Sequence, residues 1–293
     1  IRMKYIDIHS HLDREDYGSD FEEVLARMKE KGVGTIAIGA DLESSKRAVE
    51  IAEANENVWA CIGIHPEYIT SPRSASQSDP LLEAGEGKNA ALPLHLGEGQ
   101  SREAGWDEVK FEELVSSPKV VGIGECGLDY FRLKSHSAKA TRDEQINLFK
   151  SQIQFAIKHN KPLMLHIRDA YKDALEILNN YKKEAGEKLR GNIHFFAGNV
   201  EIAKKFLDLG FTMSFTGVIT FTHDYDEVIK YIPQDSIMSE TDAPFVAPVP
   251  FRGKRNEPVY VIEVIKKLAE IRREDFEILN KAILANAKRI FAF

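Results

Sequence analysis

Eight short apolar runs rich in β-branched residues recur along this 293-residue chain, and helical patterns separate them. Such runs predict buried strands, and their alternation with helices predicts a parallel sheet built from βα units. Eight units favour a closed (β/α)8 barrel, the α/β fold known as the TIM barrel. The strands are predicted at residues 4–9, 34–40, 58–64, 119–125, 162–167, 191–195, 211–216 and 236–241.

Helix boundary signals support the intervening helices. Capping-box pairs predict starts, and Gly or Pro positions predict stops. The predicted starts are Ser19 with Glu22 and Thr141 with Glu144; the predicted stops are Gly32, Gly210 and residues 160–162; a last helix is predicted within 274–293.

Composition indicates a soluble globular protein, since 43% of its residues are hydrophobic and 29% are charged. Barrels of this length commonly form one domain, so we expect residues 1–293 to be a single domain. No apolar run reaches the roughly 18 residues of a membrane helix, and residues 1–4 lead into a strand and not a signal peptide. We therefore expect a cytoplasmic protein with no membrane partner and no obligate protein partner. Cys61 and Cys126 are too few for a disulfide framework and are predicted to be buried thiols.

A long irregular stretch, residues 71–105, lies between the third and fourth predicted strands and is rich in Ser, Gly, Pro and Glu. We interpret it as an inserted loop. Loops of this length act as functional lids or are mobile segments, and the sequence does not decide between the two. His95 within it has no neighbouring ligand-type residue and is predicted to be a surface histidine.

Ligand-type side chains stand where the predicted strands end. In a barrel these carboxyl ends form the active face, so the side chains should meet there. A hydrogen-bonded core residue is the ordinary explanation for any one of them, but six coincidences at one end disfavour it. Four imidazoles and two carboxylates match the ligand count of a two-metal hydrolase. The six predicted ligands are His9, His11, Glu125, His166, His194 and Asp242.

Spacing suggests how these ligands divide. Asp7, His9 and His11 alternate along one strand and should point to one face, the barrel interior. Asp242 follows the eighth predicted strand, which adjoins the first in a closed barrel, so it can meet the two imidazoles. Glu125 ends an apolar run where an unpaired carboxylate would be costly, and it can place one oxygen on each of two cations.

His166 and His194 would then complete a second cation site beside Glu125. A pair of divalent cations can lower the pKa of a water molecule and hold phosphate oxygens during an in-line displacement. Asp242 is predicted to be both a ligand and the general base. The ions are predicted to be Mg, Mn or Zn, because imidazoles favour transition metals while phosphodiester chemistry is also compatible with Mg.

Six segments together resemble the TatD family of metal-dependent deoxyribonucleases: residues 7–12, 63–66, 124–130, 166–168, 194–198 and 240–244. The resemblance runs in order through nearly the whole chain. It implies a TIM barrel of the amidohydrolase superfamily, the same six metal ligands, and divalent-metal-dependent cleavage of DNA, often from the 3′ end. Two departures concern substrate preference: the 71–105 stretch is longer than usual in the family, and Phe196-Ala197 replaces a more usual Ser.

Several residues are predicted to contact substrate. Arg168 follows His166 by two positions and should offer its guanidinium to a phosphate, with a surface ion pair as the alternative. His65 is expected to contact substrate or a carboxylate and not a metal, because six ligands suffice. Lys254 and Arg255, in the loop after the eighth strand, are expected to contact backbone phosphates despite the net charge of −7, with a solvated turn as the ordinary alternative.

Asp129 and Glu240 are expected, by the resemblance, to support the ligands or position substrate, although buried hydrogen bonding explains each equally well.

Three other functions stay open. DNA is the predicted substrate, with RNA as an alternative. An ester or amide hydrolase, such as an aminoacyl-tRNA deacylase, could use the same ions, although the carboxylated lysine of many amidohydrolases has no counterpart where the fourth strand ends in Glu125. A non-catalytic metal-binding scaffold would be expected to lack ligands that this chain retains.

Overall fold

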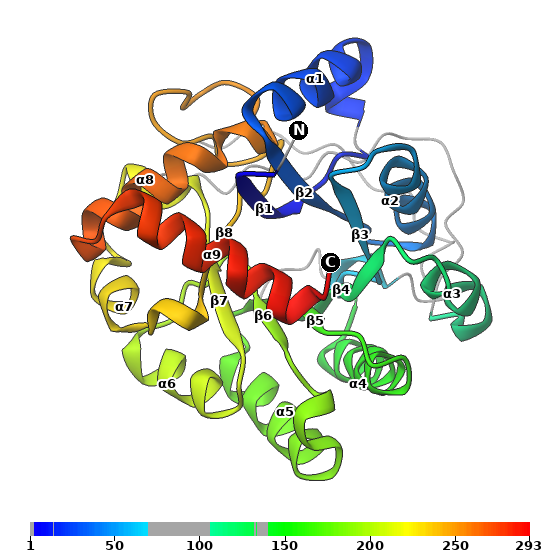
Figure 1. Ribbon diagram of the computed structural model, residues 1–293. Coiled ribbons are helices and arrows are strands. Elements are labelled where there is room, and N and C mark those ends of the chain that lie inside the picture. Colours follow the sequence, from blue (N-terminus) through cyan, green and yellow to red (C-terminus); the bar gives the residue numbers. More distant parts are fainter. Residues whose placement is uncertain (1–2, 14, 70–105, 132, 134–139) are drawn as a thin grey trace, which may run out of the picture.

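The computed structural model describes residues 3–13, 15–69, 106–131, 133 and 140–293. The predicted insertion at 71–105 and its His95 lie outside these residues. In the described part, eight parallel strands form one sheet in sequence order (Figure 1). They are β1 (Tyr5–Ser10), β2 (Val33–Ile38), β3 (Val58–Ile62), β4 (Val120–Asp129), β5 (Leu163–Arg168), β6 (Gly191–Ile193), β7 (Thr212–Phe215) and β8 (Ile237–Ser239).

The two edges of the sheet meet. A parallel bridge pairs Ser10, the last residue of β1, with Ala243, which follows β8. The Ser239 hydroxyl also donates to the Ile6 carbonyl at 3.2 Å. The predicted (β/α)8 barrel is therefore confirmed, although several strands end earlier than predicted and β4 continues to Asp129, past its predicted end at Glu125.

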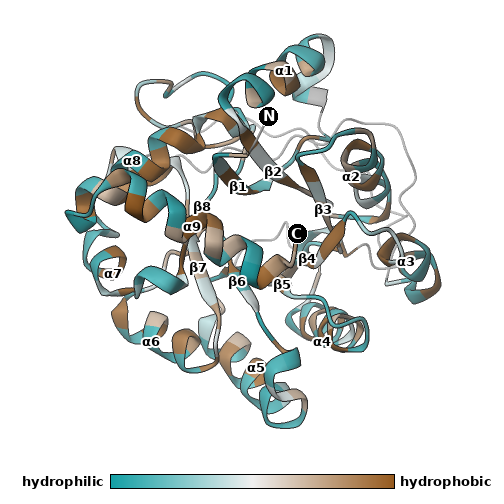
Figure 2. Ribbon diagram, in the orientation of Figure 1, coloured by the Kyte–Doolittle hydropathy of each residue, from teal (hydrophilic) through white to brown (hydrophobic). Residues whose placement is uncertain are grey.

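Helices surround the barrel, and they carry both hydrophilic and hydrophobic stretches (Figure 2), as expected for helices that pack one face on a sheet. No helix within the described residues has the length and apolar character needed to cross a membrane. The helices are α1 (Phe21–Lys31), α2 (Leu42–Ala54), α3 (Glu108–Val115), α4 (Arg142–Lys158), α5 (Tyr171–Ala185), α6 (Val200–Asp208), α7 (Asp226–Tyr231), α8 (Val261–Arg272) and α9 (Phe276–Phe291).

The last helix, α9, covers the amino-terminal end of the barrel (Figure 1). Asn280 donates to the carbonyl of Lys4, just before β1, and Asn286 donates to the carbonyl of Ile237, the first residue of β8. The prediction of a final helix is confirmed. Helix α9 therefore lies at the end of the barrel opposite to the carboxyl termini of the strands.

The helix boundary predictions have two outcomes. The Thr141–Glu144 capping box is present, Gly32 ends α1 at φ 70°, and Asn160 and Gly210 follow α4 and α6 with φ of 51° and 80°. The Ser19–Glu22 capping box is wrong, because α1 begins after Asp20. The Asp20 carboxylate binds the Arg255 guanidinium and does not cap the helix.

Both cysteines are free and buried, as predicted. Burial raises the pKa of the Cys61 and Cys126 thiols because the thiolate loses its hydration. Neither thiol is therefore an available nucleophile.

Candidate metal centre

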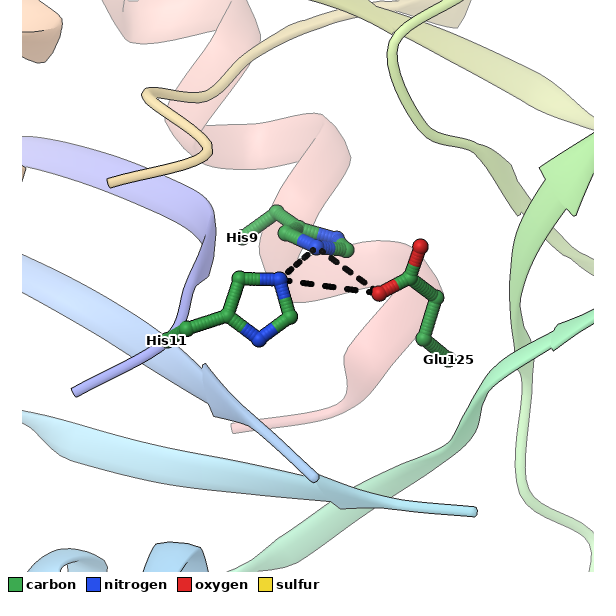
Figure 3. Close-up of side chains that lie close together, drawn as sticks. All are labelled: His9, His11 and Glu125. Atoms are coloured by element: carbon green, nitrogen blue, oxygen red, sulfur yellow. Dashed lines mark hydrogen bonds and ion pairs between the residues drawn. The ribbon is translucent and has the colours of Figure 1, made fainter. Parts of the chain in front are cut away.

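Four side chains converge at a first candidate metal position, at the carboxyl ends of the barrel strands. The Nε2 atoms of His9 and His11 lie 3.3 Å apart, and each lies 3.6 Å from Glu125 Oε2 (Figure 3). Asp242 Oδ1 lies 3.7 Å from His9 Nε2 and 3.5 Å from His11 Nε2. Two imidazole nitrogens and two carboxylate oxygens therefore surround one small volume.

The other oxygen of Glu125 faces a second position. Glu125 Oε1 lies 2.9 Å from His166 Nδ1 and 3.0 Å from His194 Nε2, and these two nitrogens are 3.3 Å apart. The His9 and His194 rings stack with centroids 3.9 Å apart, so the two positions are adjacent. Glu125 is 4% exposed and has one oxygen on each side, which is the arrangement that a bridging carboxylate requires.

These spacings suit divalent cations. Ligands about 2.1 Å from a metal ion lie roughly 3.0 Å apart in an octahedral shell and roughly 3.4 Å apart in a tetrahedral one. The separations at both positions fall around these values, from 2.9 Å for Glu125 Oε1 and His166 Nδ1 to 3.7 Å for His9 Nε2 and Asp242 Oδ1. Imidazole nitrogen together with carboxylate oxygen is also the donor set of zinc, manganese and related ions.

The closure of the barrel holds the first position together. The Asp242 N–H donates to the His9 carbonyl at 3.0 Å, and the His11 N–H donates to the Ala243 carbonyl at 2.7 Å. Asp242 has φ 55°, a left-handed conformation that Asp adopts more readily than most residues. Asp242 and His11 lie just beyond β8 and β1, and these backbone bonds bring them to the site.

Asp7 also connects β1 to the segment that follows β8. Its carboxylate accepts the N–H groups of His9 and Thr241, at 3.2 and 2.9 Å, and the Thr241 hydroxyl at 2.6 Å. Asp7 is fully buried. It therefore positions the chain on either side of the first site, and its oxygens are occupied by these donors.

Carboxylates support two of the imidazoles. Asp129 Oδ2 lies 3.0 Å from His166 Nε2, which leaves Nδ1 directed at Glu125. Glu240 Oε1 lies 3.4 Å from His194 Nδ1 and accepts the Phe195 N–H at 2.6 Å. A carboxylate behind a histidine fixes the ring and its tautomer, so that the other nitrogen presents a lone pair to a metal. Asp129 stands behind His166 in this way, whereas His194 Nδ1 lies near Glu240 without a hydrogen bond, so the roles of both carboxylates stay predictions.

We predict that Asp129→Asn lowers metal affinity at the second position by about 10- to 100-fold and leaves the first less affected, because the amide cannot accept from His166 with the same strength. Calorimetric titration with Zn²⁺ or Mn²⁺ measures this as a selective weakening of one of two binding steps. Asp208→Asn, an exposed residue at the end of α6, is the control and should leave both steps unchanged. Equal weakening of both steps would contradict the assignment.

The electrostatics also favour cations. Burial opposes protonation of His166, but hydrogen bonds to Asp129 and Glu125 outweigh it and raise its pKa to about 9. Burial likewise opposes protonation of His194, and the charges of Glu125 and Glu240 raise its pKa. The pKa of Glu125 is held well below its usual range, against burial, by the surrounding histidines. Carboxylates that draw protons onto neighbouring imidazoles would attract divalent cations to the same place.

His65 also reaches the second position, with Nε2 3.5 Å from Glu125 Oε1. Its Nδ1 accepts the Glu67 N–H at 3.1 Å, so the proton of the neutral ring is on Nε2. Burial, reinforced by the His166 charge, lowers its pKa to about 3 and keeps the ring neutral. A protonated nitrogen cannot be a ligand. His65 Nε2 therefore faces Glu125 Oε1, and its contact with substrate stays a prediction.

The cationic residues differ in their surroundings. The Arg168 guanidinium lies 3.8 Å from the centre of the Phe131 ring, and no ion pair involves Arg168 within the described residues. Lys254 is exposed. Arg255 instead binds Asp20 through both terminal nitrogens, at 2.7 and 2.5 Å, and Nη2 lies 3.2 Å from Glu257.

The structure thus assigns Arg255 a structural role in place of the predicted phosphate contact, because protein acceptors occupy both of its terminal nitrogens. The local sequence could not show this, since the partner Asp20 is 235 residues away.

Three supporting residues were not predicted. Ser214 donates to Glu240 Oε2 at 2.7 Å from β7, a strand that supplies no ligand and so gave no signal. Thr241 connects Asp7 to the Asp242 segment. Asn256 donates to the Thr241 carbonyl at 2.9 Å from the loop after β8. Such contacts join distant strands and have no local spacing by which to find them.

Comparisons with known proteins agree with this architecture. Residues 6–292 match the family model described as TatD related DNase. The uncharacterized metal-dependent hydrolase YabD of Bacillus subtilis is 36% identical over 97% of this chain and 98% of its own length, and YcfH of Escherichia coli, described in the same words, is 31% identical over 99% and 96%. The crystal structure of YJJV, a TatD homologue from Escherichia coli, superposes with a TM-score of 0.77 at 25% identity and covers 99% of both chains. The chain therefore belongs to the TatD family of metal-dependent hydrolases.

Proposed function

We propose that this protein is a two-metal phosphodiesterase that hydrolyses DNA, with a 3′-to-5′ exonuclease mode as the expected one. The observation that carries the proposal is the placement of Glu125, whose two oxygens face two separate pairs of imidazole nitrogens. Divalent ions held by the six ligands would supply an activated water and offset the charge of a phosphodiester. The family's name agrees with this substrate, while the similar hydrolases are uncharacterized.

The residues around the ions have distinct tasks. Asp242, with Oδ1 directed at the first position, is placed to orient the attacking water and accept its proton as the new P–O bond forms and the P–O bond to the leaving oxygen breaks. His65 offers Nε2–H to a nonbridging or leaving oxygen. Arg168, with no ion pair in the described part of the chain, offers planar N–H donors to a phosphate.

An amidohydrolase with a bridging carboxylated lysine has no support here. Lys119 precedes β4 at the amino-terminal end of the barrel, and its Nζ donates to the carbonyls of Asn55, Glu56 and Val58. Glu125 occupies the position that such a lysine would need. The structural neighbours that are dipeptidases or dihydroorotases share at most 15% identity with this chain and so show only the fold.

The test is hydrolysis of end-labelled single- and double-stranded DNA and RNA over a panel of Mg²⁺, Mn²⁺ and Zn²⁺. Metal-dependent shortening of DNA that Asp242→Asn abolishes would support the proposal. Release of amino acid from aminoacyl-tRNA without nuclease activity would favour the ester-hydrolase alternative, and bound metal with no turnover of either substrate would favour a non-catalytic scaffold.

We predict that Lys254→Ala weakens DNA binding and reduces the salt slope by about one counterion, because one phosphate contact is lost. Arg255→Ala should instead lower the free energy of unfolding by about 1–3 kcal/mol, since Asp20 and Glu257 lose their charged donor. Binding at several salt concentrations and urea denaturation separate the two effects. Lys188→Ala, exposed before β6, is the control. A salt slope that Lys254→Ala leaves unchanged would refute the phosphate contact.

A further inference from the structure

Phe131 is an exposed aromatic side chain beside the metal centre. It follows the last residue of β4 by two positions and is 47% exposed. The Arg168 guanidinium lies over the ring, with its central carbon 3.8 Å from the centroid. Among the residues that the structure describes, no second aromatic ring packs on Phe131. A cation thus lies over one face of the ring of an exposed residue.

Two hydrogen bonds tie this ring to the second metal position. The Phe131 N–H donates to Asp129 Oδ1 at 2.9 Å, while Asp129 Oδ2 lies 3.0 Å from His166 Nε2. The same carboxylate therefore orients a metal ligand and anchors the backbone of Phe131. The backbone of Arg168 is held in the neighbouring strand β5. Arg168 lies opposite Asp129 in the pairing of β4 with β5, and its carbonyl accepts the Tyr130 N–H at 2.8 Å.

The chemistry of the pair suits a nucleotide. A guanidinium that stacks on a ring uses its face, so its N–H donors, which lie in the plane, stay available for a phosphate. An open aromatic face stacks on any nucleobase, because every base has a π face. The pair thus presents hydrogen-bond donors for an anion next to an apolar aromatic ring, a few residues along the chain from the metal ligands Glu125 and His166.

We propose that Phe131 and Arg168 form a nucleobase-stacking subsite, in which a base next to the cleaved phosphodiester lies on Phe131 while Arg168 binds the adjoining phosphate. This rests on the proposed function and deepens it. A base on this platform has left its own duplex stack, so the substrate is a single strand or a frayed end, taken with little preference for base identity.

The test compares KM for cleavage of single-stranded oligonucleotides with KM for a set that carries one abasic residue at successive positions. For the wild-type protein, one abasic position should raise KM roughly 5- to 150-fold, the value of one stacked base. Phe131→Ala should raise KM for the intact oligonucleotide by the same factor, and the abasic residue should then add nothing. Phe131→Trp should restore the wild-type difference. Val109→Ala, a 72% exposed apolar residue on α3, is the matched control.

Each contrary outcome is separable. If Phe131→Ala impairs intact and abasic substrates equally, the ring only positions Arg168 and the stacking proposal is overturned. An unchanged KM for Phe131→Ala overturns it as well. If the wild-type protein cleaves no nucleic acid while it binds its metals, the proposed function itself fails, and the subsite falls with it.

Discussion

The Asp242→Asn variant should lose about 100- to 10,000-fold in kcat and keep its fold. The amide retains one oxygen for the first metal position but cannot accept a proton. Asp242 Oδ1 lies 3.7 and 3.5 Å from the two imidazole nitrogens of that position. The other carboxylate at that position is Glu125, and because its two oxygens face both metal positions, it cannot replace Asp242 as the base. Steady-state hydrolysis of an oligonucleotide at saturating metal measures the loss.

Metal content separates this effect from simple loss of an ion. Asp242→Asn should still bind two metal equivalents at high metal concentration, and Asp208→Asn should match the wild type in both measurements. A kcat within a few-fold of wild type for Asp242→Asn would remove Asp242 from the role of general base.

Glu125→Gln should have the second large effect, because it removes the one charge that both positions share. We expect metal affinity to fall by more than about 100-fold and activity to disappear with it, since even residues behind the ligands are worth 10- to 100-fold. Elemental analysis after dialysis would report fewer than two equivalents. Glu187→Gln, whose side chain is 98% exposed, is the control.

Stability should respond in the same direction. A ligand that binds only the folded state at 100 times its Kd adds about 2.7 kcal/mol to the free energy of unfolding. Metal should therefore raise the Tm of the wild type and raise that of Glu125→Gln much less. An equal shift in the two proteins would mean that the stabilising ions bind elsewhere.

The barrel and the ligands could be predicted from the sequence because their signals are local. Each strand has its own apolar run, and the six ligands lie within or soon after five of the strands, so the strand count and a common edge suffice to bring the ligands together. His11 and Asp242 lie past the ends of β1 and β8, yet the bridge between Ser10 and Ala243 carries them to the site.

What the sequence could not predict depends on contacts between distant elements. Asp20 directly precedes α1 and pairs with Arg255, which gives Arg255 a structural role that the local sequence does not show. The tautomer of His65 depends on the Glu67 N–H, and the proposed role of Phe131 depends on the Arg168 guanidinium over its ring. The spacing of residues along the sequence predicts neither contact.

The central claim is that Glu125 bridges two divalent ions, and anomalous scattering from crystals grown with Mn²⁺ or Zn²⁺ tests it most directly. We predict two peaks roughly 3.5–4 Å apart, one bounded by His9, His11 and Asp242 and the other by His166 and His194, with one oxygen of Glu125 on each. A single peak, or two ions that do not share Glu125, would contradict the account.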